Sequence, residues 1–415
     1  MTSKVEVLSP AGSFESLYSA INAGADSVYF GAGNLNMRSR SSYNFSIKDI
    51  EKVVQICNKN NVNSYLALNT VIYDDELIES EKILYSAKYA GVTAVIASDM
   101  AVIMKAHSMG LSVHISVQAN ISNIGSVRFF AQYANVMVMA RELSLKQIKD
   151  IADTVNGVNG NPILGPNGNP VRIEVFTHGA LCVSVSGKCY MSLAQYNTSA
   201  NRGACYQNCR RSYRVIDETD GSELVIDNKY VMSPKDICLI RYLDRILEAG
   251  VSILKLEGRG RAPDYVHTVT KVYREAVDSI SKNQYTKENI DNWEKELSSV
   301  FNRGFWHGGY YMGKALDMWS DQPDNKAAKK KTRIGIITNF FSKINIAEIT
   351  LKEGNISVGD EILIIGSTTG TEKLTVKEIR LEDKKVNEAG KGDIVSIPVE
   401  RRVRRNDQVY ILTLS

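Results

Sequence analysis

Four of the six cysteines in this chain lie close together in the sequence, as Cys182, Cys189, Cys205 and Cys209. Their thiolates would form a soft, electron-rich ligand set that suits an iron-sulfur cluster or a tetrahedral zinc ion. The spacing lacks the paired CxxC knuckles that are typical of structural zinc. The sequence therefore favours a cluster, with zinc as the alternative.

Disulfide bonds are the other common use of clustered cysteines. The sequence shows no apolar signal segment, and the remaining cysteines, Cys57 and Cys238, occur singly in stretches with helical spacing of apolar residues. We therefore expect reduced thiols and a cytoplasmic location. Cys238 could replace Cys209 as a metal ligand, but the apolar residues around it in SPKDICLIRYL indicate a core position.

The first 280 residues alternate short apolar segments with amphipathic stretches, which is the pattern of parallel βαβ units. Eight such segments favour an α/β fold, a (β/α)8 TIM-like barrel over residues 1–280, with an open doubly wound sheet as the alternative. The glycines at 31 and 33 form too short a motif to indicate a dinucleotide site. The predicted strands cover residues 5–10, 27–31, 64–68, 94–97, 112–117, 136–140, 172–177 and 253–258.

In a barrel of this type, the residues after the carboxyl ends of the strands form the active site. The connection between the seventh and eighth strands is unusually long and carries the clustered cysteines, as an insertion at about 181–245. A metal bound there would lie over the barrel mouth. The structural alternative is a metal that only stabilises the fold of the long insertion. The candidate residues at the strand ends are Asn69, Asp99, Gln118, Arg141, Glu142, His178, Glu257 and Arg259.

A chain of 415 residues exceeds what one hydrophobic core supports, so at least two domains are expected. After residue 331 the pattern changes to alternating strands with turn residues between them, which predicts a small C-terminal β-barrel over 331–415. The segment 281–330 is expected to connect the two and to pack on the first barrel. The predicted C-terminal strands cover 333–340, 344–351, 360–366, 373–381, 393–399 and 408–415.

The composition excludes several classes of protein. With 44% hydrophobic and 23% charged residues it is typical of a globular protein, and no apolar run is long enough to cross a bilayer. The net charge of +4 does not by itself indicate a nucleic-acid binder. Positive charge is concentrated at 326–333 and 400–405, which are either solvated surface or part of an RNA-binding face.

The residues 174–192, EVFTHGALC with GKCYMS after it, resemble the signature of the collagenase-like peptidase family U32. The opening LSPAGSFESLYSAINAGADSVYFG and the later KLEGRGRAPDYV also resemble this family, so the likeness covers most of residues 5–320. The C-terminal β-barrel is similar to the second domain of translation factors. The family name implies a peptidase of unassigned catalytic type. The sequence, however, shows no GxSxG elbow, HExxH pair or evident Cys-His dyad.

Better understood members of the family are iron-sulfur proteins that hydroxylate RNA bases or quinone precursors. This resemblance implies a 4Fe-4S cluster on the four clustered cysteines, tRNA as partner, and prephenate as co-substrate for hydroxylating the wobble uridine to 5-hydroxyuridine. The compact Cys205-x3-Cys209 pair is similar to the RNA branch. A peptidase and a non-catalytic tRNA-binding module with a structural metal are the alternatives, and the sequence identifies no electron-transfer partner.

Arginines are the expected substrate ligands. Arg259 is a candidate catalytic residue together with His178. With Arg141 and Arg261 it is also expected to bind a dicarboxylate such as prephenate, because guanidinium and carboxylate form paired hydrogen bonds. Surface ion pairing is the alternative. Glu257 is a further candidate for substrate binding.

The seventh predicted strand carries two further candidates. Two-residue alternation would place Glu174, Phe176 and His178 on one face, where Glu174 is expected to form an ion pair inside the barrel. His178 is expected either to carry protons near the cluster or to be a satisfied structural residue.

Overall fold

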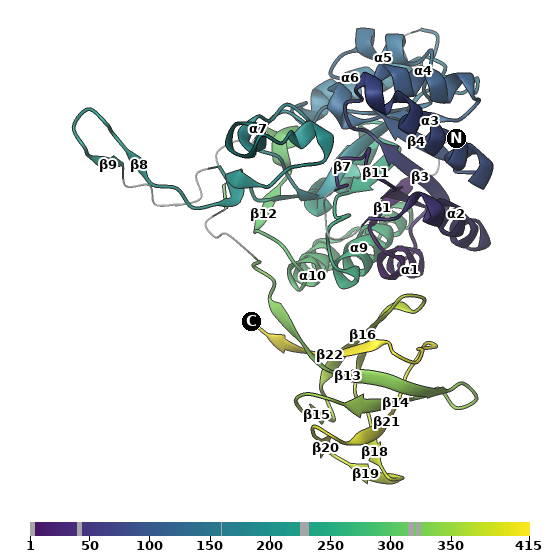
Figure 1. The fold of residues 1–415 in the computed structure, drawn as a ribbon, viewed down its shortest axis with the longest axis vertical. Helices are drawn as coiled ribbons and strands as arrows, with labels where there is room; N and C mark the ends of the chain where they lie inside the picture. The colour runs from purple at the N-terminus through teal and green to yellow at the C-terminus, as the bar shows by residue number, and fades with distance from the viewer. Residues whose placement is uncertain (1–4, 40–43, 159, 225–231, 314–318, 321–324) are drawn as a thin grey trace.

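The computed structural model describes residues 5–39, 44–158, 160–224, 232–313, 319–320 and 325–415 (Figure 1). Eight parallel strands pair in chain order and close into a barrel, because β11 pairs with both β1 and β7. The predicted barrel is confirmed, and the open-sheet alternative is wrong. The barrel strands are β1 (Glu6–Ala11), β2 (Ser27–Gly31), β3 (Asn63–Leu68), β4 (Ala94–Ala97), β5 (Val113–Ile115), β6 (Val136–Val138), β7 (Arg172–Ala180) and β11 (Ile253–Leu256).

Helices cover the outside of the barrel (Figure 1). Several begin at residues that cap a helix, such as Ser144, whose side chain accepts a hydrogen bond from the backbone N–H of Gln147 while the Gln147 side chain accepts one from the Ser144 N–H. No helix among the described residues is both long and apolar enough to cross a membrane. The outer helices are α1 (Phe14–Asn22), α2 (Ile50–Lys59), α3 (Leu77–Ala90), α4 (Met100–Ser108), α5 (Ile124–Phe130), α6 (Leu145–Val155), α8 (Leu243–Glu248) and α9 (Pro263–Ser281).

The core of the barrel has two layers. The larger lies between the strands and the helices, and the smaller fills the barrel interior. Hydrophobic burial of both layers is the main stabilising contribution. The interior layer consists of Leu8, Tyr29, Tyr65, Ala94, Ile96, Val136 and Ile253.

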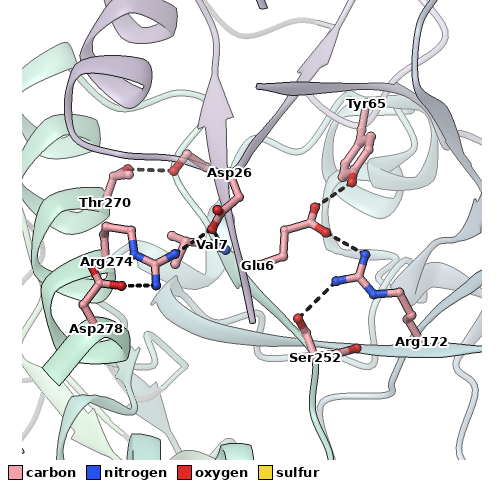
Figure 2. A network of polar contacts seen from close by, with 10 residues as sticks. Glu6, Val7, Asp26, Tyr65, Arg172, Ser252, Thr270, Arg274 and Asp278 are labelled. Carbon is pink, nitrogen blue, oxygen red and sulfur yellow. Dashed lines mark hydrogen bonds and ion pairs between the residues drawn. The ribbon is translucent and has the colours of Figure 1, made fainter. Parts of the chain in front are cut away.

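A polar network closes the amino-terminal end of the barrel (Figure 2). Glu6 accepts hydrogen bonds from the Tyr65 hydroxyl at 2.6 Å and from Arg172 at 2.7 Å. Arg172 also donates to the carbonyl of Ser252 at 3.3 Å, so the network joins β1, β3, β7 and the start of β11. This end of the barrel is therefore held together by ion pairing, and the opposite end remains for a functional site.

The insertion between β7 and β11 extends the barrel sheet. In it, β10 (Asp236–Cys238) pairs antiparallel with the end of β7, and β12 (Phe305–His307) pairs with β10. Cys238 is fully buried, as expected, but the helical conformation predicted for it is wrong. Pairing with β7 determines the strand, whereas the helical spacing belongs to the residues that follow it, in the 3-10 helix Ile240–Tyr242 and in α8.

The C-terminal region is an antiparallel sheet around a single hydrophobic core. The segment predicted as one strand at 373–381 forms two, because its first part pairs with β16 and its last part pairs with β19 and β21. The eight-stranded sheet consists of β13 (Lys329–Phe341), β14 (Ile346–Leu351), β16 (Glu361–Gly366), β17 (Gly370–Thr375), β18 (Ile379–Leu381), β19 (Lys384–Val386), β21 (Ile394–Pro398) and β22 (Gln408–Leu414). A separate pair consists of β15 (Ile356–Ser357) and β20 (Glu388–Ala389).

This sheet lies beside α1, α9 and α10 (Lys287–Ser298), the last of which packs on α9 (Figure 1). The hydroxyls of Ser19 and Thr371 are 2.8 Å apart, and Asn22 donates to the carbonyl of Thr369 at 3.0 Å. Gly370, with φ +71°, lies so close to the helix that an added Cβ would be 2.8 Å from the Ser19 nitrogen. The C-terminal sheet is thus in direct contact with the first helix of the barrel.

Candidate functional site at the barrel mouth

A pocket of about 250 Å³ lies at the carboxyl ends of the barrel strands. Strand-end residues form one side, and the insertion between β7 and β11 forms the other. The residues from the insertion include the four clustered cysteines. The cationic residues that line the pocket are Arg38, Arg141, Arg210, Lys255, Arg259, Arg261 and Arg303.

The cysteines reach the pocket from separate short elements. Cys182 follows the end of β7, Cys189 precedes α7 (Met191–Tyr196), and Cys205 and Cys209 lie before and within the 3-10 helix Asn208–Arg210. All six cysteines of the chain are free thiols. Four thiols on one pocket match the number and softness of ligands that an iron-sulfur cluster takes. Among the described residues, no three His, Cys, Asp or Glu side chains form a ready site for a metal ion.

The electrostatics of the cysteines reflect their proximity. Burial raises the pKa of Cys209 to about 11, and the charges of Cys182, Cys205 and Cys189 act in the same direction, while Arg210 opposes them. The four sulfur atoms are therefore near enough to influence one another. A group that accepts all four thiolates would offset this repulsion.

Two arginines anchor the insertion. The guanidinium of Arg202 forms two hydrogen bonds with Glu76, one of them at 2.7 Å. Arg210 donates to the carbonyl of Leu181 at 2.8 Å and to Ser233 at 3.0 Å. These contacts hold the cysteine-bearing segments against the barrel.

Glu257 and Arg38 form an ion pair at 2.6 Å beside the pocket. Burial opposes ionisation of Glu257, but Arg38, together with Arg259 and Arg261, lowers its pKa below the ordinary value. Glu257, a predicted substrate ligand, thus lines the pocket with a positively charged partner already in place.

Arg259 and Arg141 line the pocket with few partners. Arg259 is 5% exposed, and the structure gives it one hydrogen bond, to the Asn36 carboxamide oxygen at 3.1 Å. Burial lowers its pKa to about 10. The Arg141 guanidinium lies 4.2 Å from the centre of the Phe176 ring, and its buried Nε has no hydrogen-bond partner. Arg261 stacks on Phe301 at 3.6 Å, so it is aligned by a ring.

Glu174 lies deeper in the barrel. Its Oε1 accepts a hydrogen bond of 2.6 Å from Lys255, and both side chains are buried. The ion pair expected of Glu174 inside the barrel is thus confirmed. Its Oε2 has no hydrogen-bond partner and lies 3.9 Å from Nδ1 of His114.

His178 does not share the strand face of Glu174 and Phe176. The register of β11 against β7 shifts, so that Lys255 lies opposite Phe176 and Leu256 lies opposite His178. The extra residue on β7 reverses the alternation at this point. The expectation of one common face is therefore wrong.

His178 instead lies outside the pocket lining, among aromatic rings. Its ring centre is 5.5 Å from that of Tyr273 on α9 and 5.6 Å from that of Phe305 on β12. Burial, with a smaller effect of His307, lowers the pKa of His178 to about 3. A neutral, enclosed imidazole matches the expectation that His178 is a structural residue and not a proton carrier.

The remaining strand-end candidates divide into two groups. Asn69 and Gln118 line the pocket and are 3.3 Å apart. Asp99 does not line it, because its carboxylate caps α4 by accepting from the N–H of Ala101 at 2.9 Å. Glu142 is exposed and also lies outside the lining.

Sequence reasoning missed several pocket residues. Lys255 was detectable, because it is a charged residue within an otherwise apolar predicted strand. Arg210 directly follows Cys209, so its proximity to the thiols was also foreseeable. Arg38 and Arg303 lie far from the cysteines in the sequence, and only the fold brings them to the pocket.

Together, fold and site define a TIM-barrel protein with a four-cysteine insertion over the barrel mouth. The chain belongs to Peptidase family U32, whose model matches residues 12–321. It is 47% identical over 98% of its length to a protein of Porphyromonas gingivalis named collagenase, 97% of which is covered. It is 30% identical over 92% of its length to tRNA hydroxylation protein P1 of Bacillus subtilis, 88% of which is covered.

A third relative is larger than this chain. The chain is 34% identical over 67% of its length to a 23S rRNA 5-hydroxycytidine synthase of Escherichia coli, 40% of which is covered. All three relatives are named as enzymes or as proteins that modify RNA.

Proposed function

We propose that this protein hydroxylates RNA with the help of an iron-sulfur cluster. The most specific form of the proposal is conversion of the tRNA wobble uridine to 5-hydroxyuridine, with prephenate as co-substrate. The observation that carries it is the pocket itself, in which four free thiols and seven cationic side chains converge. Relatives named for tRNA hydroxylation and for rRNA hydroxycytidine synthesis support the reaction class.

Cys182, Cys189, Cys205 and Cys209 would hold a 4Fe-4S cluster, which would supply one-electron chemistry at the pocket. The residues around the cluster would bind and orient the co-substrate. Arg141 and Arg259 provide donors for carboxylates, and burial in a pocket of low dielectric strengthens these interactions. Zinc on the same thiols is the alternative, and it would make the centre structural.

A second cavity supports a path for RNA. It has a volume of about 780 Å³, lies between the barrel and the C-terminal sheet, and shares Gly260 and Arg261 with the mouth pocket. Lys329, Lys330, Lys331 and Lys373 also line it. Lys329 and Lys373 pair with Glu361, and Lys331 pairs with Asp264. Exposed Lys330 is therefore the cation of this group that a phosphodiester backbone would contact on its way to the pocket. The basic stretch predicted near 326–333 would then belong to the RNA-binding face.

The name of the Porphyromonas relative is the observation that favours a peptidase. Proteolysis by a cysteine nucleophile would require a partnered base. Among the described residues, His178 is enclosed by rings away from the pocket, and no histidine lines the pocket with the cysteines. The chemistry of the pocket therefore gives the peptidase less support than RNA hydroxylation.

The test is anaerobic purification of the full chain, with assays for iron, acid-labile sulfide and zinc, followed by nucleoside analysis of tRNA from cells that carry each variant. Cys205→Ser should lose iron, sulfide and the hydroxylated nucleoside together. Cys57→Ala is the matched control, because Cys57 lies in α2 away from the pocket. Gelatin cleavage that survives in Cys205→Ser, with the tRNA unmodified in wild type, would overturn the proposal in favour of the peptidase.

A further inference from the structure

Lys255 is a buried lysine with spare hydrogen-bonding capacity at the bottom of the mouth pocket. It is 5% exposed and lines the pocket. An ammonium group has three N–H donors, and the structure gives Lys255 one hydrogen bond within the described chain, to Glu174. The rings of Tyr29 and Phe176 lie 4.7 Å and 5.5 Å from its Nζ. One side of the amino group is thus paired, and apolar rings flank it.

The groups around Lys255 would recognise a carboxylate next to a carbonyl. Arg259 lines the same pocket with a single hydrogen bond, and Arg141 lies over the Phe176 ring, which also flanks Lys255, with an unpartnered Nε. Two guanidinium groups can each bind a carboxylate. A primary amine in a dry pocket beside other cations is the usual setting for a lysine that reacts with a carbonyl group.

Glu174 provides a place for the proton. Its Oε1 is 2.6 Å from the lysine Nζ, and its Oε2 is unpartnered. Burial raises the pKa of Glu174, although Lys255 opposes this effect. The 2.6 Å contact places this carboxylate where it would exchange a proton with Nζ.

We propose that Lys255 forms a Schiff base with a 2-oxo acid bound in the mouth pocket. The amine adds to the carbonyl carbon, the hydroxyl of the resulting carbinolamine leaves as water, and a C=N bond replaces the C=O bond. Glu174 takes the proton that Nζ releases and delivers it to the departing hydroxyl, and no oxidant is consumed. The inference rests on the proposed function for its co-substrate, since prephenate is a 2-oxo acid with a second carboxylate.

Reductive trapping tests the inference on the intact protein. The full chain is incubated anaerobically with prephenate, with 2-oxoglutarate as a second probe, and with malate as a carbonyl-free control. Sodium cyanoborohydride then fixes any C=N bond, and peptide mass spectrometry locates it. The expected result is a secondary amine on Lys255 with each 2-oxo acid and none with malate. Labelling spread over exposed lysines, with Lys255 unmodified, would overturn the inference.

Two variants distinguish a covalent role of Lys255 from a role of its positive charge alone. Lys255→Arg keeps the cation and its pairing with Glu174 but removes the nucleophile, so it should bind 2-oxoglutarate in equilibrium dialysis and form no adduct at position 255. Lys271→Arg is the control and should label like wild type, because Lys271 is a half-buried lysine of α9 that pairs with Glu296 and does not line the mouth pocket. Because the adduct is sought in the wild-type protein, a variant that fails to fold does not prevent the test.

The outcome is distinguishable from failure of the proposed function. An adduct on Lys255 together with unmodified tRNA would support the Schiff base and overturn RNA hydroxylation. Modified tRNA together with bound 2-oxoglutarate and an unlabelled Lys255 would overturn the Schiff base alone.

Discussion

Arg38 donates a hydrogen bond of 2.6 Å to Oε1 of Glu257, which links the segment after β2 to the end of β11 at the barrel mouth. The two residues are 219 positions apart in the sequence. This ion pair fixes one arginine and leaves the neighbouring Arg259 without a carboxylate of its own among the described contacts. The pocket is therefore neutralised on one side and cationic on the other.

Glu257→Gln should destabilise the fold, because it removes the carboxylate that Arg38 faces. The Arg38 side chain is 31% exposed. We therefore expect the free energy of unfolding to fall by about 1 to 2 kcal/mol, which is less than the loss for breaking a fully buried ion pair. Urea unfolding would measure the loss. Asp150→Asn, which breaks the surface pair with Lys146, is the control and should change stability by less than about 0.5 kcal/mol. Equal effects in both variants would contradict a special role for the Arg38 pair.

His178→Phe should make stability less dependent on pH and leave the proposed RNA hydroxylation in place. The folded-state pKa of His178 is about 3, against 6.5 as its ordinary value. Between these values the unfolded chain binds a proton that the folded chain does not, so stability falls as the pH decreases through about 6.5. The slope for one such histidine is at most about 1.4 kcal/mol per pH unit.

Denaturant unfolding at pH 7.5 and pH 5.5 would show whether His178→Phe reduces this difference. If the variant instead keeps the pH dependence and loses the hydroxylated nucleoside, the proton-carrier role of His178 would be restored.

Gly31→Ala should weaken anion binding more than it weakens the fold. An added Cβ would lie 2.3 Å from Nη1 of Arg259 and 2.5 Å from the Asn36 carboxamide oxygen. Both are ends of flexible side chains, so they can move aside, but the guanidinium would leave its position in the pocket. Losing one charge-assisted hydrogen bond corresponds to about tenfold in affinity.

Isothermal titration with 2-oxoglutarate would measure this change. Arg259→Lys should produce a similar loss, because an ammonium lacks the planar pair of donors. Unchanged affinity in both variants would exclude Arg259 as a ligand.

Gly370→Val should detach the C-terminal sheet from the barrel while the barrel stays folded. The added side chain would collide with the backbone of α1 near Ser19, and the φ of +71° is unfavourable for a branched residue. Limited proteolysis should then cut between the barrel and β13 faster than in wild type. Iron and sulfide content should be unaffected, and a parallel loss of both would contradict an independent barrel.

Lys330→Ala tests the proposed RNA path. Lys330 is exposed on β13 and lines the cavity that leads to Arg261. Each phosphate contact that is removed should lower the slope of log affinity against log salt by about 0.7 to 0.9. Filter binding of tRNA from low to moderate salt would measure it. Lys384→Ala, on β19 outside the cavity lining, should leave the slope unchanged.

The sequence was sufficient for the barrel, because its eight strands are short, apolar and regularly separated by helices. It was insufficient wherever a distant partner determines the local structure. Cys238 is a strand residue because β7 is available for pairing, and His178 turns outward because β7 has one residue more than β11 at the bulge.

Some residues of the candidate site were predictable from the sequence, and others reach it only through the fold. The four cysteines were identifiable from residue type and spacing, and Arg141, Glu257, Arg259 and Arg261 from their places after strands. Arg38 reaches the pocket through a segment that the strand pattern does not describe. Asp99 occupies the expected strand end but is used by the helix that follows it.

Arg261 belongs to the linings of both cavities, so a ligand in the mouth pocket and a ligand in the second cavity would contact the same guanidinium. Any ligand that repositions this guanidinium in one cavity changes the free energy of binding in the other. The coupling must be reciprocal, so the factor by which an acid alters RNA affinity equals the factor by which RNA alters affinity for the acid. Under the proposed function, the acid and the RNA would thus be coupled through one side chain without any movement of the barrel.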